Sequence, residues 1–118
     1  MSDVYSGDFS SWSDVCSYFD IEVAEPDQVL YAVCDCPDYE GYADVIYRVG
    51  DRFYWAHGSH CSCYGLEDQW APIEYSQQEL AEALLRGHHF YYAENSDAVR
   101  DEILRRVSAE SQPQLGHA

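Results

Sequence analysis

Residues 42–57 contain two β-type segments joined by a two-residue turn, and this pattern constrains the fold more than any other feature of the chain. Tyr42–Val49 and Arg52–His57 are rich in β-branched and aromatic residues, which favour strands. Gly50 and Asp51 between them are residue types that tight hairpin turns prefer. A two-residue turn also fixes the register, which pairs Arg48 with Phe53, Ile46 with Trp55, and Asp44 with His57.

Both faces of this hairpin carry apolar side chains, because successive residues of a strand point to opposite faces. Ile46, Phe53 and Trp55 fall on one face, and Val45, Val49 and Ala56 fall on the other. A sheet with two apolar faces must be covered on both sides. We therefore expect helices over one face and another segment over the other.

One further strand and three helices are predicted around the hairpin. Val29–Cys36 (VLYAVCDC) has the composition of a strand. A capping pattern predicts one helix that begins near Ser11, with Asp14 three residues later, and a clearer pattern predicts a second that begins at Ser76, with Glu79.

A third helix is predicted over residues 95–107, where Val99, Ile103 and Val107 share one face. Asp101–Arg105 and Glu102–Arg106 are spaced for ion pairs along this helix. The predicted fold class is therefore α+β: a three-stranded antiparallel meander sheet with one N-terminal helix and two C-terminal helices. We expect a single α+β domain over residues 1–108 and a flexible polar tail over residues 109–118.

The charge of the chain is strongly unbalanced. Twenty-two acidic residues face six basic residues, all of them Arg, which leaves a formal net charge of −16. No Arg or Lys occurs before Arg48, although eleven acidic residues do. Such a charge repels nucleic acids and anionic membranes, so we expect no direct binding to either and favour a basic protein as partner.

Carboxylates at alternate positions of a strand can imitate a row of phosphates, since both repeat at roughly 7 Å. Tyr side chains among the acids would add anchors of the kind found in protein interfaces. The candidate partner-binding residues are Asp35, Asp38, Tyr39, Glu40, Tyr42 and Asp44 in the first hairpin, and Glu22, Glu25 and Asp27 before it.

The segment from His57 to Trp70 holds the only dense group of His and Cys residues. A zinc site there would draw its four ligands from Cys34, Cys36, His57, His60, Cys61 and Cys63. The C-x-C spacing is weak evidence for zinc, and no cofactor is the favoured expectation, because buried Cys is common as a small apolar residue. A zinc-stabilised structural or adaptor module is the alternative function.

The same segment allows two other interpretations. Cys61 or Cys63 with His60 could form a thiol enzyme, but the negative field of the chain disfavours a thiolate, so we expect no enzyme activity. Alternatively, Gly58 and Gly65 bracket a rigid connecting loop whose far end Leu66 and Trp70 anchor in the core. We favour this structural role for the segment.

The segment GSHCSCYGLEDQW, Gly58–Trp70, resembles one found in small uncharacterised acidic proteins of bacteriophages, where a helix of the ELAEALLR kind often follows. The resemblance spans roughly residues 57–86, implies a phage or prophage origin, and implies no catalytic residues. With the charge pattern, it suggests an inhibitor of a basic, nucleic-acid-handling host protein. A defence nuclease, a CRISPR effector and a transcription factor are examples of such targets.

No secretory signal or apolar run of about 18 residues is evident, so we expect a cytoplasmic location in the host cell. The oligomeric state stays open, and a homodimer is compatible with the sequence.

Overall fold

The protein forms an α+β fold in which one mixed sheet is covered on both faces. A computed structural model describes residues 3–35, 41–60, 66, 69–85 and 96–110. The elements in chain order are β1 (Tyr5–Gly7), α1 (Trp12–Phe19), β2 (Gln28–Asp35), β3 (Gly41–Val49), β4 (Arg52–His60), β5 (Ile73–Tyr75), α2 (Gln77–Leu85) and α3 (Ser96–Glu110).

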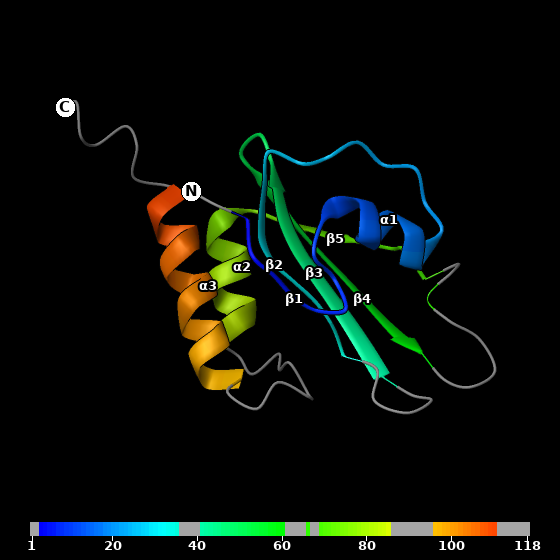
Figure 1. Cartoon of the computed structure of the whole chain (residues 1–118). Coiled ribbons are helices and arrows are strands. Elements are labelled where there is room, and N and C mark those ends of the chain that lie inside the picture. Colours follow the sequence, from blue (N-terminus) through cyan, green and yellow to red (C-terminus); the bar gives the residue numbers. More distant parts are fainter. Residues whose placement is uncertain (1–2, 36–40, 61–65, 67–68, 86–95, 111–118) are drawn as a thin grey trace.

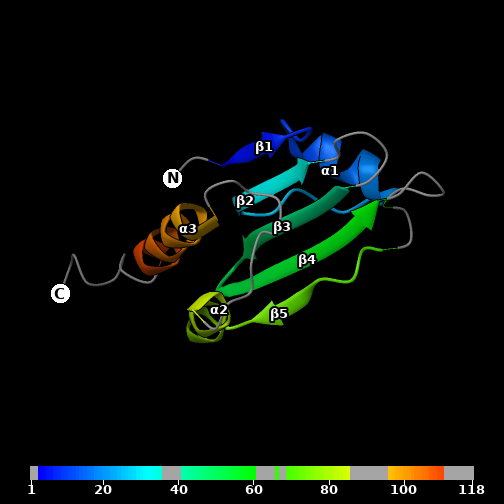
Figure 2. The same cartoon turned by 90° about the horizontal axis from the view of Figure 1, so that it is seen from below.

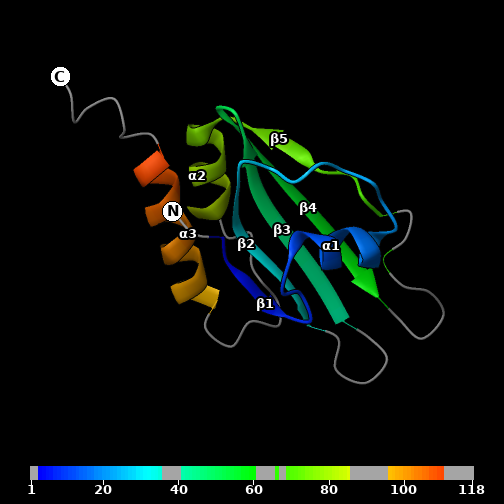
Figure 3. The same ribbon diagram turned by 45° about the horizontal axis from the view of Figure 1, so that its top comes forward.

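The sheet has five strands in the order β1-β2-β3-β4-β5, and this corrects the predicted three-stranded antiparallel meander. β1 pairs with β2 in parallel, and the other neighbouring strands are antiparallel. The two strands that the sequence did not reveal, β1 and β5, have three residues each and form the edges of the sheet (Figure 3). Runs this short show no alternation, so only their tertiary pairing defines them.

The predicted hairpin register is confirmed. Arg48 pairs with Phe53, Ile46 with Trp55, and Asp44 with His57, while Gly50 adopts a positive φ of 63° in the turn. β4 continues to His60, so the first residues of the predicted connecting loop belong to a strand. Gly58 is required there for space and not for a positive φ, because a Cβ would lie 2.9 Å from Leu66 Cδ2 and 3.1 Å from Phe19 Cε1.

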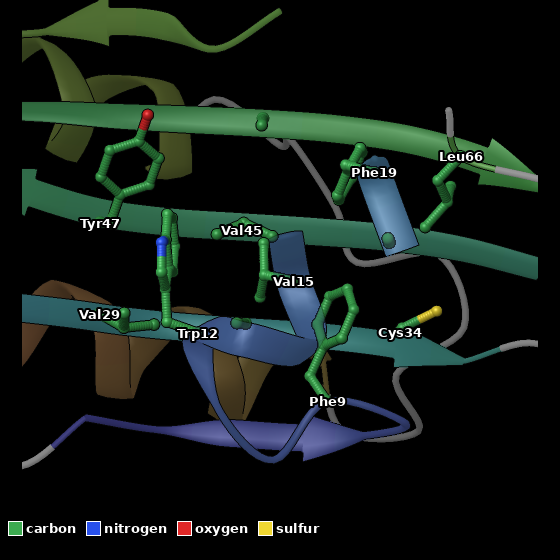
Figure 4. Packing of buried hydrophobic residues seen from close by; sticks show 12 residues of the cluster. Phe9, Trp12, Val15, Phe19, Val29, Cys34, Val45, Tyr47 and Leu66 are labelled. Atoms are coloured by element: carbon green, nitrogen blue, oxygen red, sulfur yellow. The ribbon is translucent and has the colours of Figure 1, made fainter. Parts of the chain in front are cut away.

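Helices cover both faces of the sheet, on opposite sides (Figures 1 and 2). On the α1 face, Trp12, Val15 and Phe19 of the helix pack against Val45 and other strand residues (Figure 4). Leu66 and Trp70 also pack in this cluster, as the sequence predicted. Val49, which we expected to be buried on the same face, is exposed at the hairpin end.

The opposite face, called the α2–α3 face below, is closed by α2 and α3. Its apolar cluster contains eight buried residues: Leu30, Ile46, Phe53, Trp55, Leu80, Leu84, Ile103 and Val107. β2 contributes to both clusters, as β3 and β4 do, because successive strand residues point to opposite faces. Its register shifts between Val29 and Tyr31, and the successive residues Leu30 and Tyr31 both pack on the α2–α3 side.

The helix caps follow the sequence closely. Ser76 and Glu79 form a reciprocal capping box, with Ser76 N donating to Glu79 Oε1 at 2.8 Å and Glu79 N donating to Ser76 Oγ at 3.1 Å. At α1, Ser11 Oγ accepts from Asp14 N at 3.3 Å. The Asp14 carboxylate, however, accepts from the N–H and hydroxyl of Ser10, and these bonds lower the pKa of Asp14.

The final helix extends to Glu110, two residues past the predicted end of the domain, and residues 111–118 lie outside the described residues. The predicted Glu102–Arg106 pair forms at 3.2 Å. Arg105 pairs with Glu102 as well, whereas Asp101 lies 3.6 Å from Arg100, so the predicted Asp101–Arg105 pair is wrong. None of the helices in the described ranges is long and apolar enough to cross a membrane.

The buried side-chain amide of Gln28 is expected to lower the stability of the fold. Gln28 is 2% exposed, and among the described residues neither its Nε2 nor its Oε1 has a hydrogen-bond partner. Replacing Gln28 with Met keeps the side-chain length and removes the buried amide. We expect Gln28→Met to raise the free energy of unfolding by about 1–2 kcal/mol, measured by urea denaturation.

The matched control is Gln77→Met. Gln77 Nε2 donates to the carbonyl of Val107 at 2.8 Å, so the same substitution removes a bond that is made. It should lower the free energy of unfolding by about 1 kcal/mol. If both substitutions change the free energy of unfolding in the same direction, the buried amide of Gln28 does not destabilise the fold.

Candidate functional site

An acidic surface lies on and beside α1. It consists of four exposed carboxylates, Asp8, Asp20, Glu22 and Glu25, together with exposed Tyr18 and Val23. None of the four carboxylates makes a hydrogen bond or an ion pair with a described residue. We call these six residues the α1 acidic surface.

The segment that carries three of these carboxylates is held in place by main-chain and side-chain bonds. Asp20 ends α1 in the left-handed conformation, with φ 57°, and its N–H donates to the carbonyls of Cys16 and Ser17. Farther along, Trp12 Nε1 donates to the carbonyl of Val23 at 2.8 Å. The main chain that carries Glu22 and Glu25 therefore has few alternative conformations, and their carboxylates project from a restrained segment.

Asp27, at the end of this segment, is hydrogen-bonded to the β3–β4 hairpin through both its carboxylate and its N–H. Its carboxylate accepts from Gly50 N at 2.6 Å, and its own N–H donates to the carbonyl of Arg48 at 3.0 Å. Asp3 likewise accepts from Val29 N at 2.9 Å. These two exposed acids bind the N-terminal region to the sheet. Within residues 3–27, the carboxylates without a described partner are therefore those of the α1 acidic surface.

The negative potential of this region affects a neighbouring side chain. Burial, together with the smaller effect of the Asp3 and Glu25 carboxylates, raises the pKa of Tyr5 to about 12. Both causes disfavour a phenolate, because an anion would be poorly solvated and close to like charges.

The described arginines lie elsewhere and are engaged locally. Arg52 pairs with Glu74 at 2.6 Å, and Arg48 Nη1 donates to the carbonyl of Gly50 at 2.6 Å. Arg100, Arg105 and Arg106 lie on α3, across the sheet from α1 (Figure 1), and each is paired with an acid of the same helix. Within the described ranges, no basic residue offsets the α1 acidic surface.

A second polar group lies on the α2–α3 face. Asp44 is 1% exposed, and its Oδ1 accepts from Trp55 Nε1 at 3.0 Å and from His57 Nδ1 at 2.8 Å. The His57 side chain is 45% exposed, and its ring stacks on Tyr42 with centroids 6.1 Å apart. A buried carboxylate thus fixes the orientation of a half-exposed imidazole.

The bond from Asp44 raises the pKa of His57, and the burial of the ring opposes this only in part. The carboxylate stabilises the imidazolium because it accepts the Nδ1 proton and supplies the opposite charge. The proton that His57 gains or loses is therefore the one at Nε2, while Nδ1 stays bonded to Asp44.

The structure changes the role of several predicted partner-binding residues. Asp44 is buried, so it cannot belong to an exposed row of carboxylates. Tyr42, Glu22, Glu25 and Asp27 are exposed as expected, although the carboxylate of Asp27 is engaged. The side chain of Asp35 and the whole of Asp38, Tyr39 and Glu40 lie outside the described residues.

Two of the six candidate zinc ligands, Cys34 and His57, lie on opposite faces of the sheet. Cys34 is buried on the α1 face, whereas His57 bonds to Asp44 on the α2–α3 face, so one ion cannot reach both. The other candidates, Cys36, the side chain of His60, Cys61 and Cys63, fall outside the described residues, as do the thiols of the thiol-enzyme hypothesis. The part of the chain that the structure describes contains no group of three or more potential metal ligands.

Sequence reasoning missed Tyr18 as a surface anchor. It lies on α1 but outside the stripe formed by Trp12, Val15 and Phe19, and it is 41% exposed. An aromatic residue off the apolar stripe of an amphipathic helix was the available signal.

No family model, no curated protein and no solved structure matches this chain.

Proposed function

We propose that the protein is a small acidic inhibitor of the bacteriophage type, which binds a basic, nucleic-acid-handling host protein through the α1 acidic surface. The observation that carries the proposal is the separation of charge: free carboxylates lie on and beside α1, while the described arginines are bonded or paired elsewhere. A surface of this sign would occupy a site that normally receives phosphates, and would steer the basic partner toward it.

The anchoring of residues 20–27 supports this role. Binding by a flexible acidic segment would require ordering of many side chains and of the main chain, which opposes association. Here the bonds at Asp20, Val23 and Asp27 fix the main chain before any partner arrives. Tyr18 adds a flat apolar contact with little side-chain entropy to lose.

The test compares two triple variants of equal charge. Asp20→Asn/Glu22→Gln/Glu25→Gln neutralises three of the four carboxylates of the α1 acidic surface, and Asn tolerates the left-handed conformation of residue 20. Asp51→Asn/Glu82→Gln/Asp101→Asn neutralises three exposed acids elsewhere. Both variants change the net charge from −16 to −13, because each removes three negative charges.

The partner is first captured from bacterial lysate at low salt by the wild-type chain and then purified. We expect the surface variant to bind it about tenfold more weakly, since exposed charge pairs contribute about 0.2–1 kcal/mol each, and the control variant to bind almost as the wild type does. The binding should weaken with added salt, and the wild type should compete with nucleic acid for the partner. Equal losses for the two variants would show that net charge, and not this surface, drives the binding.

A further inference from the structure

The outer edge of β4 is only partly paired by its neighbouring strand. β4 spans nine residues, but β5 pairs only with Phe53, Tyr54 and Trp55. Ala56–His60 extends beyond β5 on that edge. Exposed edges of this kind can pair with another chain through their free N–H and C=O groups.

Gln69 bonds to this edge with its side chain. Gln69 Oε1 accepts from Ser59 N at 2.8 Å, and Gln69 Nε2 donates to the carbonyl of Ser59 at 2.6 Å. These are the two bonds that an opposite residue in an antiparallel strand would make with its main chain. The side-chain carboxamide thus replaces a peptide group.

The position of Gln69 follows from the register of β5. Phe53 pairs with Tyr75 and Trp55 with Ile73, and the same antiparallel register carried onward brings residue 69 opposite Ser59. Pro72 stands directly before β5 and has no N–H for a ladder. The ladder between β4 and β5 therefore ends at Ile73, and the side chain of Gln69 makes the next bonds along the β4 edge.

On the outer edge of β4, His57 lies between Trp55, which pairs with β5, and Ser59, which bonds to Gln69. Residues two apart on a strand direct their main-chain groups to the same edge, so those of His57 point outward like those of Ser59. No described residue bonds to the main-chain N–H or C=O of His57 on this side. Release of Gln69 would therefore leave two adjacent outward positions, at His57 and Ser59.

We propose that Gln69 is a latch on the β4 edge, and that with the latch removed this edge pairs with the same edge of a second copy. An antiparallel pairing centred on Gly58 places His57 of one copy opposite Ser59 of the other, and it uses both outward positions, which lie beyond Trp55, the last β4 residue that β5 pairs with. Such an arrangement is self-complementary, as a twofold dimer requires. Ala56–His60 contains no acidic residue, so two strongly negative chains would meet where the strand itself adds no repulsion.

Three proteins test the proposal: the wild type, Gln69→Met, and Gln69→Met/Ser59→Pro. Met keeps the length of the side chain and lacks both amide groups. Pro at residue 59 removes an N–H that points away from β3, so it blocks the outer edge and spares the β3–β4 hairpin. Gln69→Ala is the substitute if the Met variant does not fold.

Sedimentation velocity over a concentration series is expected to give a monomer of 13.5 kDa for the wild type and for the double variant. Gln69→Met should approach twice that mass as its concentration rises. At low concentration its Ser59 amide should exchange with deuterium about tenfold faster than in the wild type, because the bond from Gln69 is gone.

Three results would overturn the proposal. Unchanged exchange at Ser59 would show that Gln69 is no latch. Faster exchange in a variant that stays monomeric would show that the open edge takes no second copy. A dimer that survives Ser59→Pro would show that the copies meet through a different surface.

Discussion

Gly7→Ala is expected to lower the free energy of unfolding by roughly 3 kcal/mol, and to loosen β1 from the sheet. Gly7 ends β1 with a positive φ of 63°, which costs an alanine about 1–2 kcal/mol. An added Cβ would also overlap the carbonyl oxygen of Cys34 on the neighbouring strand. That oxygen accepts from Asp8 N at 2.8 Å, so relief of the overlap would strain the main-chain bond that closes the parallel pair.

Gly50→Ala is the matched control for this prediction. Gly50 has the same φ of 63°, but a Cβ there would meet no atom within 4 Å. Its cost should therefore be limited to the conformational part, about 1–2 kcal/mol. The difference between the two variants, measured by urea denaturation, isolates the overlap with Cys34, and equal losses would contradict the close approach of the two strands.

The parts of the fold that local chemistry determines were predictable. Gly50–Asp51 fixed the hairpin register, and the Ser76–Glu79 pattern fixed the start of α2, because turns and caps depend on residues within a few positions. β1 was not predictable in this way. It pairs with β2 only after α1 has crossed over, and Gly7 reveals its role only beside the carbonyl of Cys34.

The sequence predicted that the candidate site is acidic, but it did not predict which of the acidic residues lie on the surface. The lack of basic residues before Arg48 indicated an acidic region, and Glu22 and Glu25 are indeed exposed there. Asp44 is also acidic and falls in the same half of the chain, yet it is buried. Its environment depends on Trp55 and His57 from the next strand, so counting acids could not separate a surface carboxylate from a buried one.

Asp44→Ala is expected to lower the free energy of unfolding by about 3 kcal/mol. The substitution leaves the Trp55 indole N–H without its acceptor in a buried position, and removes the carboxylate that orients His57. Asp44→Asn keeps an oxygen for the Trp55 indole and loses only the charge. It should cost about 1 kcal/mol, which separates the geometric role of Asp44 from its electrostatic role.

The pH dependence of stability distinguishes these two roles further. Asp44 raises the pKa of His57 in the folded state above its ordinary value of 6.5, so the folded protein holds this proton more tightly than the unfolded chain. The resulting stabilisation is complete below pH 6.5 and is lost as the pH rises through the raised pKa. The stability difference between the wild type and Asp44→Asn should therefore be largest below pH 6.5 and should decrease as the pH rises through the raised pKa of His57.

An NMR titration of the His57 ring gives the same comparison directly. The net charge of the chain also favours an imidazolium, but this long-range effect is almost equal in the wild type and in Asp44→Asn. A fall in the pKa of His57 in the variant thus measures the contribution of Asp44 alone. The contrary result is an unchanged pKa of His57 together with a difference in free energy of unfolding between the two proteins that does not vary with pH. In that case the two side chains are not coupled, and the raised pKa must come from the general negative potential of the protein.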